Sequence, residues 1–197
     1  MRFLKTFQGV CLIAVILHGC ATNNAKNIAR NYSLDEERGT GVVLVSLTQT
    51  GFLPSFNVAL RLRDANNKKR YDEDVLVNDP SQSSELGCPY SETNTGKNSC
   101  GRRLAILELP QGEYEFYTWH ATSSSLFSQR SIAPEDEFSK RFKITSGQVV
   151  YIGNLWLIYG EGQYKIQMSD MRQRDIQLLY RKHPHIYPDN IIINIPQ

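Results

Sequence analysis

Short runs in which apolar and polar residues alternate recur along most of the chain, and they constrain the fold more than any other feature. The run at 56–64 is the clearest, because Phe56, Val58, Leu60 and Leu62 alternate with residues that are polar or smaller. A period of two places the apolar side chains on one face of a β-strand. Turn-forming residues separate the runs, which predicts a chain built mainly from strands.

The predicted strands cover most of the chain between residues 41 and 169. The run at 41–49 is apolar at successive positions, which is typical of a central strand that is buried on both faces. The other predicted strands are 56–64, 74–79, 102–110, 113–121, 137–144, 148–159 and 162–169, with a further short candidate at 190–195. This number and spacing of short strands favours an antiparallel β-sandwich.

One helix is expected after the last of the regular strands. Ser169 or Asp170 can cap it, and an apolar stripe including Ile176 and Leu179 continues toward Lys182. The dipeptide His183-Pro184 is expected to end it, because proline disfavours helical backbone in the residue before it. The predicted fold is therefore mainly β with one C-terminal helix.

The N-terminus has the organisation of an export signal. Arg2 and Lys5 precede an apolar run from Val10 to Leu17. That run fits the roughly 7–15 residues of a signal sequence and is shorter than the roughly 20 that span a bilayer. We therefore interpret residues 1–19 as a signal peptide.

The end of this run, Leu17-His18-Gly19-Cys20, resembles the lipobox of bacterial lipoprotein signals. The resemblance implies that the chain is cut before Cys20, that this cysteine receives the lipid, and that the new N-terminus is acylated. Alanine rather than aspartate follows the cysteine, which favours sorting to the outer membrane. The domain is expected to face the periplasm, with the cell surface as the alternative. A secreted protein with an unrelated cysteine is the alternative.

Charge and composition divide and limit the remaining chain. The formal net charge is +2, and both excess positive charges belong to the predicted signal peptide. A neutral mature chain argues against a nucleic-acid partner, because such proteins carry a basic surface. Residues 20–38 lack an apolar period and are interpreted as a lipidated cysteine with a flexible tether. Residues 39–197 are interpreted as one β-sandwich domain with a C-terminal helix and tail.

Two cysteines remain in the exported part, at positions 88 and 100. Between Cys88 and Cys100 lies a short polar segment rich in Ser, Thr, Asn and Gly. A cysteine pair in an exported protein indicates a disulfide, which here would close a surface loop. A two-cysteine metal site is the alternative, although no histidine lies nearby in the sequence.

A family resemblance supports the β-sandwich interpretation. Its two motifs are ELPQGEYEFYTW and FKITSGQVVYIGNL, in which the matching residues are Leu109, Pro110, Gly112, Tyr114 and Phe116, then Gly147, Tyr151, Ile152 and Gly153. The pattern is similar to one in many uncharacterised bacterial envelope lipoproteins, and it resembles transthyretin-like and carboxypeptidase-regulatory-like sandwich modules. The resemblance implies a fold rather than an activity.

Histidine-containing groups are the first candidates for chemistry. His183 and His185 near Asp189 suggest a metal site, but surface residues at a helix end are the favoured explanation. His120 lies near Ser123, Ser124 and Ser125, but no nucleophile motif surrounds these serines. We therefore assign no catalytic residue, no metal and no cofactor.

The other candidates have simpler structural explanations. Gly160-Glu161-Gly162 lacks the helix and lysine of a phosphate loop and predicts a hairpin turn. Asp72-Glu73-Asp74 lacks calcium-loop spacing and is interpreted as solvated charge. The aromatic residues from Tyr114 to Trp119, with Tyr151 and Trp156, are candidates for a sugar or peptide groove or for the core.

Two functional hypotheses follow from these features. The first is a lipid-anchored, non-enzymatic β-sandwich that binds another envelope protein or a cell-wall component. The second is an envelope hydrolase or metal-dependent enzyme, which a compact cluster of His120, His183 and His185 with acidic residues would favour.

Overall fold

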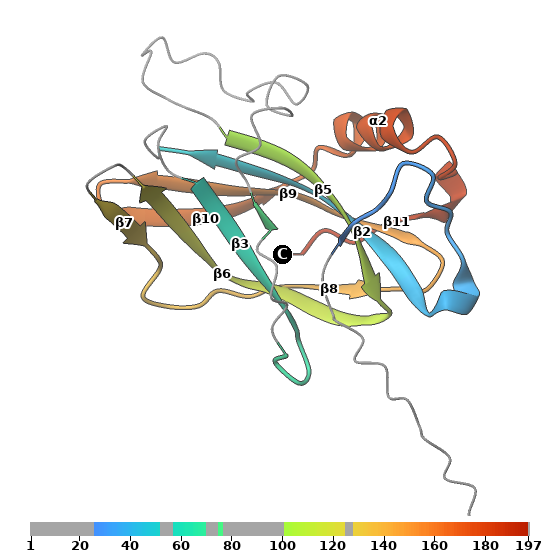
Figure 1. Ribbon diagram of the computed structural model, residues 1–197, viewed down its shortest axis with the longest axis horizontal. Coiled ribbons are helices and arrows are strands. Elements are labelled where there is room, and N and C mark those ends of the chain that lie inside the picture. Colours follow the sequence, from blue (N-terminus) through green and yellow to red (C-terminus); the bar gives the residue numbers. More distant parts are fainter. Residues whose placement is uncertain (1–25, 52–56, 70–74, 77–100, 125–127, 197) are drawn as a thin grey trace, which may run out of the picture.

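The structure is a computed structural model that describes residues 26–51, 57–69, 75–76, 101–124 and 128–196. Figure 1 shows its elements, which are β1 (Lys26–Asn27), η1 (Glu36–Arg38), β2 (Thr40–Thr50), β3 (Asn57–Asp64), β4 (Val75–Leu76), β5 (Gly101–Pro110), β6 (Gly112–Ser124), β7 (Gln129–Ile132), β8 (Lys140–Ile144), β9 (Val149–Gly160), β10 (Gln163–Ser169), α2 (Arg172–Lys182), η2 (Pro188–Asn190) and β11 (Ile191–Ile193). The predicted signal peptide, Cys20, Cys88 and Cys100 lie outside these ranges.

The described residues form two sheets and one α-helix, so the prediction of a mainly β chain with a late helix is confirmed. The first sheet has the order β1-β5-β2-β9-β10, with β11 also paired to β9. The second has the order β4-β3-β6-β7, with β8 also paired to β6. Strands β1 and β7 were not predicted, since they are only 2 and 4 residues long and carry no apolar alternation. No helix in the described ranges has the length and apolar character to cross a membrane.

The first sheet is mixed: three of its strand pairs are antiparallel, and two parallel pairs were not predicted. β2 lies parallel to β9, with Val42 opposite Val149, and β11 lies parallel to β9 on its other side, with Ile191 opposite Val149. A parallel pair cannot be closed by a tight turn and needs a long connection. Here strands β3 to β8 lie between β2 and β9 along the chain.

Strand β2 lies in the middle of the first sheet, as its continuous apolar run predicts. It pairs with β5 on one side and β9 on the other, and residues 41–49 are all buried. The register with β9 shifts opposite Val45, next to Gly153. Gly153 has a φ of +96°, and a Cβ there would lie 3.0 Å from the carbonyl oxygen of Ser169. Glycine is therefore the residue that fits this bulge.

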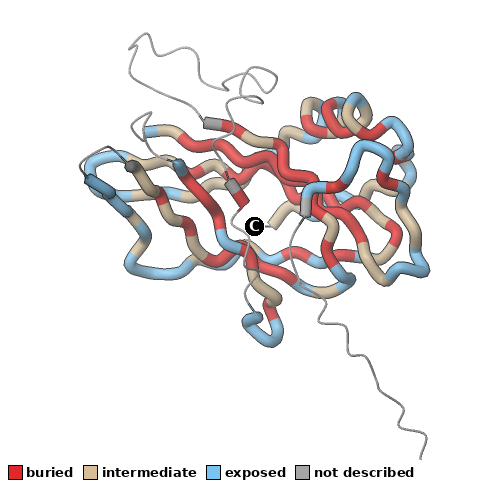
Figure 2. Tube along the Cα trace, in the orientation of Figure 1, coloured by how far each residue is buried: buried red, intermediate tan, exposed pale blue. Residues whose placement is uncertain are grey.

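The two sheets face each other across a shared hydrophobic core. The first contributes residues such as Val43 and Leu155, and the second contributes residues such as Leu60, Phe116 and Trp119. Figure 2 shows the buried residues concentrated along these facing strands. Burial of Val58, Leu60 and Leu62 on one side of β3 agrees with the alternation in the sequence.

The outer face of the first sheet is covered by α2 and by the segment before η1. Leu178 and Leu179 of the helix share a second core with Ile28, Tyr32 and residues of β2. The interpretation of 20–38 as a flexible tether is therefore wrong for residues 26–38. Ile28 and Tyr32 are isolated apolar residues in a polar stretch, so they form no periodic pattern in the sequence. Both are nevertheless only 9% exposed in the structure.

The chain passes from the first sheet to the second at Gln111. β5 ends at Pro110 and β6 begins at Gly112, and the Tyr114 hydroxyl donates a hydrogen bond of 2.8 Å to the Pro110 carbonyl. Tyr114 and Phe116 then enter the shared core, as the sequence pattern predicts. This short crossing ties the two sheets together at one end.

Candidate functional site

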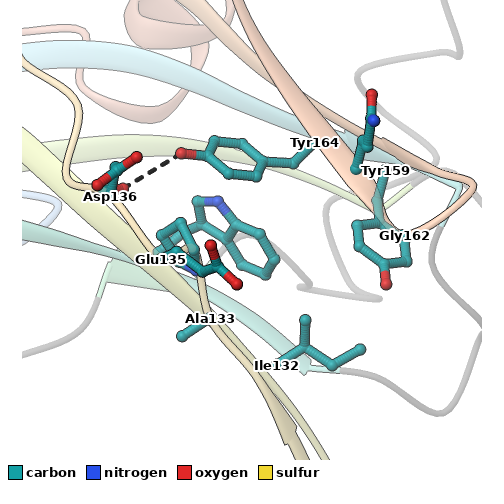
Figure 3. Close-up of a pocket in the computed structure, with 10 residues that line it drawn as sticks. Ile132, Ala133, Glu135, Asp136, Tyr159, Gly162 and Tyr164 are labelled. Atoms are coloured by element: carbon teal, nitrogen blue, oxygen red, sulfur yellow. Dashed lines mark hydrogen bonds between the residues drawn. The ribbon is translucent and has the colours of Figure 1, made fainter.

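A pocket of about 440 Å³ lies where the second sheet meets the β9–β10 hairpin of the first. Trp119 of β6 and Ile132 of β7 contribute from the second sheet. Tyr159 and Tyr164 contribute from the hairpin, and the segment 133–136 closes another side (Figure 3). The volume is within the range of ordinary ligand pockets, which is roughly 300–1,000 Å³.

Three aromatic rings form the apolar part of this pocket. The Trp119 ring centroid lies 5.5 Å from that of Tyr164 and 6.4 Å from that of Tyr159, and the ring planes meet at 71° in both pairs. Such edge-to-face contacts are favourable and hold the rings in fixed orientations. Trp119 is 1% exposed, whereas both tyrosines are half-buried. Trp119 is therefore the floor, and the tyrosines are walls that solvent reaches.

A tight turn positions the two tyrosine walls. Tyr159 and Tyr164 are direct cross-strand partners around the turn at Glu161 and Gly162. These turn residues have φ values of +53° and +78°, which are characteristic of the two-residue turn that matches the twist of a hairpin. The prediction of a hairpin turn at Gly160-Glu161-Gly162 is thereby confirmed.

Acidic side chains border the aromatic rings. Glu135 and Asp136 are both exposed, and the Tyr164 hydroxyl donates a hydrogen bond of 3.2 Å to the Asp136 carbonyl. This bond holds the acidic segment against the hairpin through the backbone of Asp136, and the Asp136 carboxylate takes no part in it (Figure 3). Of the described residues that line the pocket, two are acidic and none is basic. The pocket thus combines aromatic walls with negative charge.

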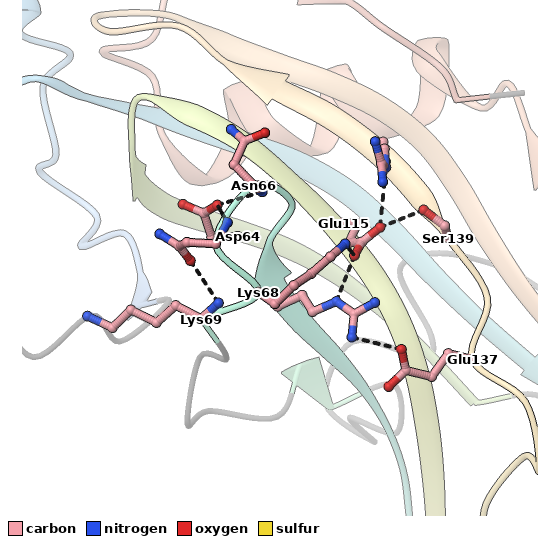
Figure 4. Close-up of polar contacts among 10 residues, drawn as sticks. Asp64, Asn66, Lys68, Lys69, Glu115, Glu137 and Ser139 are labelled. Atoms are coloured by element: carbon pink, nitrogen blue, oxygen red, sulfur yellow. Dashed lines mark hydrogen bonds and ion pairs between the residues drawn. The ribbon is translucent and has the colours of Figure 1, made fainter.

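Another acidic residue, Glu115 of β6, is engaged entirely by the chain itself (Figure 4). It is 1% exposed. Oε1 accepts from Arg63 Nε and Lys68 Nζ, both at 2.6 Å, and Oε2 accepts from Ser139 Oγ at 2.6 Å. Burial raises its pKa, but the hydrogen bonds from Lys68, Ser139 and Arg63 outweigh burial and lower the pKa to about 2. Glu115 is therefore a structural carboxylate.

Local geometry at the end of β3 presents Lys68 to this carboxylate. The Asp64 carboxylate accepts hydrogen bonds from the backbone N–H groups of Asn66 and Asn67, at 2.8 and 3.0 Å. Lys68 follows with a φ of +59°. Short polar side chains stabilise such turns by bonding the backbone ahead of them. Because the chain turns directly after β3, the Lys68 side chain can reach Glu115 on the neighbouring strand β6.

A third polar cluster joins α2 to the outer face of the first sheet. Asp175 is fully buried, and it accepts hydrogen bonds from Ser46 at 2.7 Å, Tyr151 at 3.1 Å and Arg174 at 2.8 Å. Burial, followed by the charge of Asp175, raises the pKa of Tyr151, so its hydroxyl remains protonated. Tyr151 also accepts from the backbone N–H of Met171 at 2.9 Å. These contacts dock the helix on the sheet.

The structure does not bring the three candidate histidines together. His120 lies on β6 between Trp119 and Ala121, which are both in the core, so it faces away from the first sheet. His183 caps the C-terminus of α2 on the far side of that sheet, where burial lowers its pKa, and His185 is exposed. In the described part of the chain, no group of three or more His, Cys, Asp or Glu residues is placed to hold a metal ion.

The aromatic residues singled out in the sequence separate into different environments. Tyr114 and Phe116 belong to the shared core, and Tyr151 bonds Asp175. The Trp156 indole donates to Thr50 at 3.1 Å. Within that set, Trp119 is the residue that lines the pocket.

The remaining candidates contribute no described site. Ser123 lies on β6, whereas Ser125 and the acidic group Asp72-Glu73-Asp74 lie outside the described residues. Sequence reasoning missed Tyr159 and Tyr164 as site residues. Their signal is the hexapeptide YGEGQY, because a two-residue turn makes the flanking tyrosines cross-strand partners.

Comparisons of the chain with protein-family models, with curated proteins and with solved structures found no match.

Proposed function

We propose that this chain is a lipid-anchored envelope protein that binds another envelope component through the pocket between β6 and the β9–β10 hairpin. Its role in this proposal is non-enzymatic, and the domain is a transthyretin-like β-sandwich. The lipid is attached at Cys20, the protein lies at the outer membrane facing the periplasm, and Cys88 and Cys100 form a disulfide.

The observation that carries the binding role is the combination of groups in the pocket. Three aromatic rings and the exposed acidic residues Glu135 and Asp136 line one hollow of about 440 Å³. Aromatic side chains supply contact area at a small cost in side-chain entropy, and a few polar groups at the rim fix the orientation of a ligand. By contrast, Glu115 and Asp175 are occupied by hydrogen bonds within the chain.

The lipoprotein part of the proposal is supported by the lipobox-like ending at Cys20 and by the short apolar run before it. Several acyl chains, at about 0.8 kcal/mol per buried CH₂ group, would anchor the chain stably at a membrane surface. The two facing sheets and their shared core support the sandwich interpretation. A binding domain held at a membrane acts on components of the same compartment.

Site-specific photocrosslinking in the native host tests this function. A benzoylphenylalanine at Gln163, an exposed pocket residue, is expected to form one discrete adduct in membranes. The same group at Lys143, an exposed residue of β8, is the matched control and should not form that adduct. Mass spectrometry then identifies the partner.

Two further variants make the crosslinking decisive. Tyr159→Leu should remove the adduct while the protein stays in the membrane fraction, because one pocket wall is lost. Cys20→Ala should prevent incorporation of labelled palmitate and release the protein from membranes or leave it unprocessed. Equal adducts from Gln163 and Lys143 would contradict a binding role for the pocket, and a processed, membrane-bound Cys20→Ala protein would contradict the anchor.

A further inference from the structure

We propose that the aromatic pocket binds the guanidinium group of an arginine side chain that a partner protein presents. This inference rests on the proposed function, because it assumes that the pocket is a binding site, and it names the chemical group that enters. The observations behind it are the arrangement of the rings, the charge of the rim, and a second site in the same chain where an arginine is held in this way.

The ring arrangement suits a planar cation. Tyr159 and Tyr164 each stand at 71° to the Trp119 indole, so aromatic surfaces of different orientation border the same hollow. The face of an aromatic ring carries negative potential and attracts a cation that lies within about 6 Å of its centre. Tyrosine walls reached by solvent allow such a group to enter without unfolding either sheet.

The rim supplies the second element of arginine recognition. Glu135 and Asp136 are exposed acidic residues at the edge of the pocket, and no basic residue is among the described residues that line it. Glu161, in the hairpin turn between the two tyrosines, adds a further exposed acidic residue nearby. The electrostatic field at the pocket therefore favours a cation and disfavours an anionic ligand.

The Glu115 cluster shows how this chain holds an arginine. The Arg63 guanidinium carbon lies 4.2 Å from the centre of the Tyr117 ring. The same guanidinium bonds Glu115 at 2.6 Å and Glu137 at 2.7 Å. One aromatic face and two carboxylates thus bind one arginine at that site. The pocket likewise combines aromatic rings with the acidic residues Glu135 and Asp136.

The geometry favours arginine over lysine. A guanidinium is planar, is more weakly hydrated than an ammonium, and can stack on a ring while its N–H groups point at carboxylates. An ammonium is a compact, strongly hydrated charge that gains less from flat aromatic walls. A side chain on an exposed loop of a partner can reach the pocket, because Gly162, Gln163 and Glu135 on its border are all exposed.

Fluorine NMR of the purified full chain in uncharged detergent micelles tests the proposal. The chain contains two tryptophans, so 5-fluorotryptophan labelling gives two signals, and Trp156→Phe assigns the one from Trp119. N-acetylarginine amide is expected to shift the Trp119 signal saturably. N-acetylcitrulline amide, which is nearly isosteric but neutral, should bind at least about tenfold more weakly, because it lacks the cation.

Two charge variants and one further probe complete the test. The double variant Glu135→Gln/Asp136→Asn should weaken arginine binding at least about fivefold, whereas Glu37→Gln/Glu113→Gln, which changes exposed carboxylates elsewhere, should leave it unchanged. Equal binding of the arginine and citrulline amides overturns the proposal, and so does binding of N-acetyllysine amide as tight as that of arginine. If the Gln163 crosslink persists while arginine fails to bind, the pocket remains a binding site and only its ligand class is wrong.

Discussion

The Glu115 cluster and the aromatic pocket use residues of the same strand, β6, and the same kinds of chemical group, but they differ in what completes them. At Glu115 the chain supplies its own arginine and lysine, so the carboxylate is buried and paired. At the pocket, Glu135 and Asp136 are exposed beside Trp119 and the two tyrosines. A carboxylate that the chain neutralises itself stabilises the fold, whereas one left at an aromatic rim is available to a partner.

The largest expected effect is a difference in the free energy of unfolding between a variant that lacks the Glu115 carboxylate and one that lacks the Glu135 carboxylate. Glu115→Ala should lower that free energy by about 3 kcal/mol, because Arg63, whose side chain is 13% exposed, loses its buried carboxylate partner and keeps only Glu137, which is 49% exposed. Lys68 and Arg141 are 49% and 63% exposed, so solvent screens their share of the loss. Glu135→Ala should change the value by no more than about 0.5 kcal/mol. Urea unfolding of both variants measures the difference, and equal effects would contradict the distinction between the two regions.

A pH dependence of stability should accompany the Glu115 cluster. Folding lowers the pKa of Glu115 from 4.5 to about 2, so between these values the unfolded chain binds the proton more tightly. The stabilisation is therefore complete above about pH 4.5 and is lost as the pH falls toward 2. The stabilisation that this lowered pKa provides is at most about 3 kcal/mol, because each pKa unit corresponds to about 1.36 kcal/mol.

Urea unfolding at a series of pH values separates this residue from the other carboxylates. Glu115→Gln should flatten the dependence in that window, while Glu135→Gln should follow the wild-type curve. A Glu115→Gln curve with the wild-type slope would show that other groups are responsible for the acid sensitivity. This measurement sharpens the comparison because it reports on the charge of the buried carboxylate rather than on its volume.

The smallest expected effect is at the pocket wall. Tyr164→Phe removes the hydroxyl that bonds the Asp136 carbonyl at 3.2 Å but keeps the ring against Trp119. The free energy of unfolding should fall by about 0.5 kcal/mol, since the carbonyl can bond water instead. Tyr187→Phe, at a tyrosine that is 67% exposed, is the control and should have no effect. A loss above about 2 kcal/mol would mean that the pocket wall supports the fold as strongly as the Glu115 cluster does.

Local patterns account for most of the strands and for the helix. The alternation in β3 predicted which residues enter the core, and the apolar run of β2 predicted a central strand. The helix ends at Lys182 as expected, but the prediction that Ser169 or Asp170 caps its start is wrong: the N-cap is Met171, which makes no side-chain cap bond, and Asp170 accepts from the backbone N–H of Arg172 at 3.0 Å from one residue earlier. Strand period and turn chemistry act over a few residues, so they can be read from the sequence.

The candidate site depended on contacts that no local pattern contains. The hairpin that pairs Tyr159 with Tyr164 was predictable from its turn, but Trp119 reaches them from the other sheet. The same holds for Asp175, which appears in the sequence as one polar position of a helix and binds Ser46 from the second strand of the chain. Burial of such groups becomes visible only when the elements are packed together.

By itself, the sequence determined the mainly β character, the strand faces, the late helix and the hairpin turn, because backbone preference and side-chain period are local properties. Tertiary structure alone decided the parallel pairing of β2 with β9, the packing of Ile28 and Tyr32 on the first sheet, and the meeting of Trp119 with Tyr159 and Tyr164. These features join residues far apart in the chain. Their stability comes from surface buried between elements, a quantity that exists only once both elements have formed.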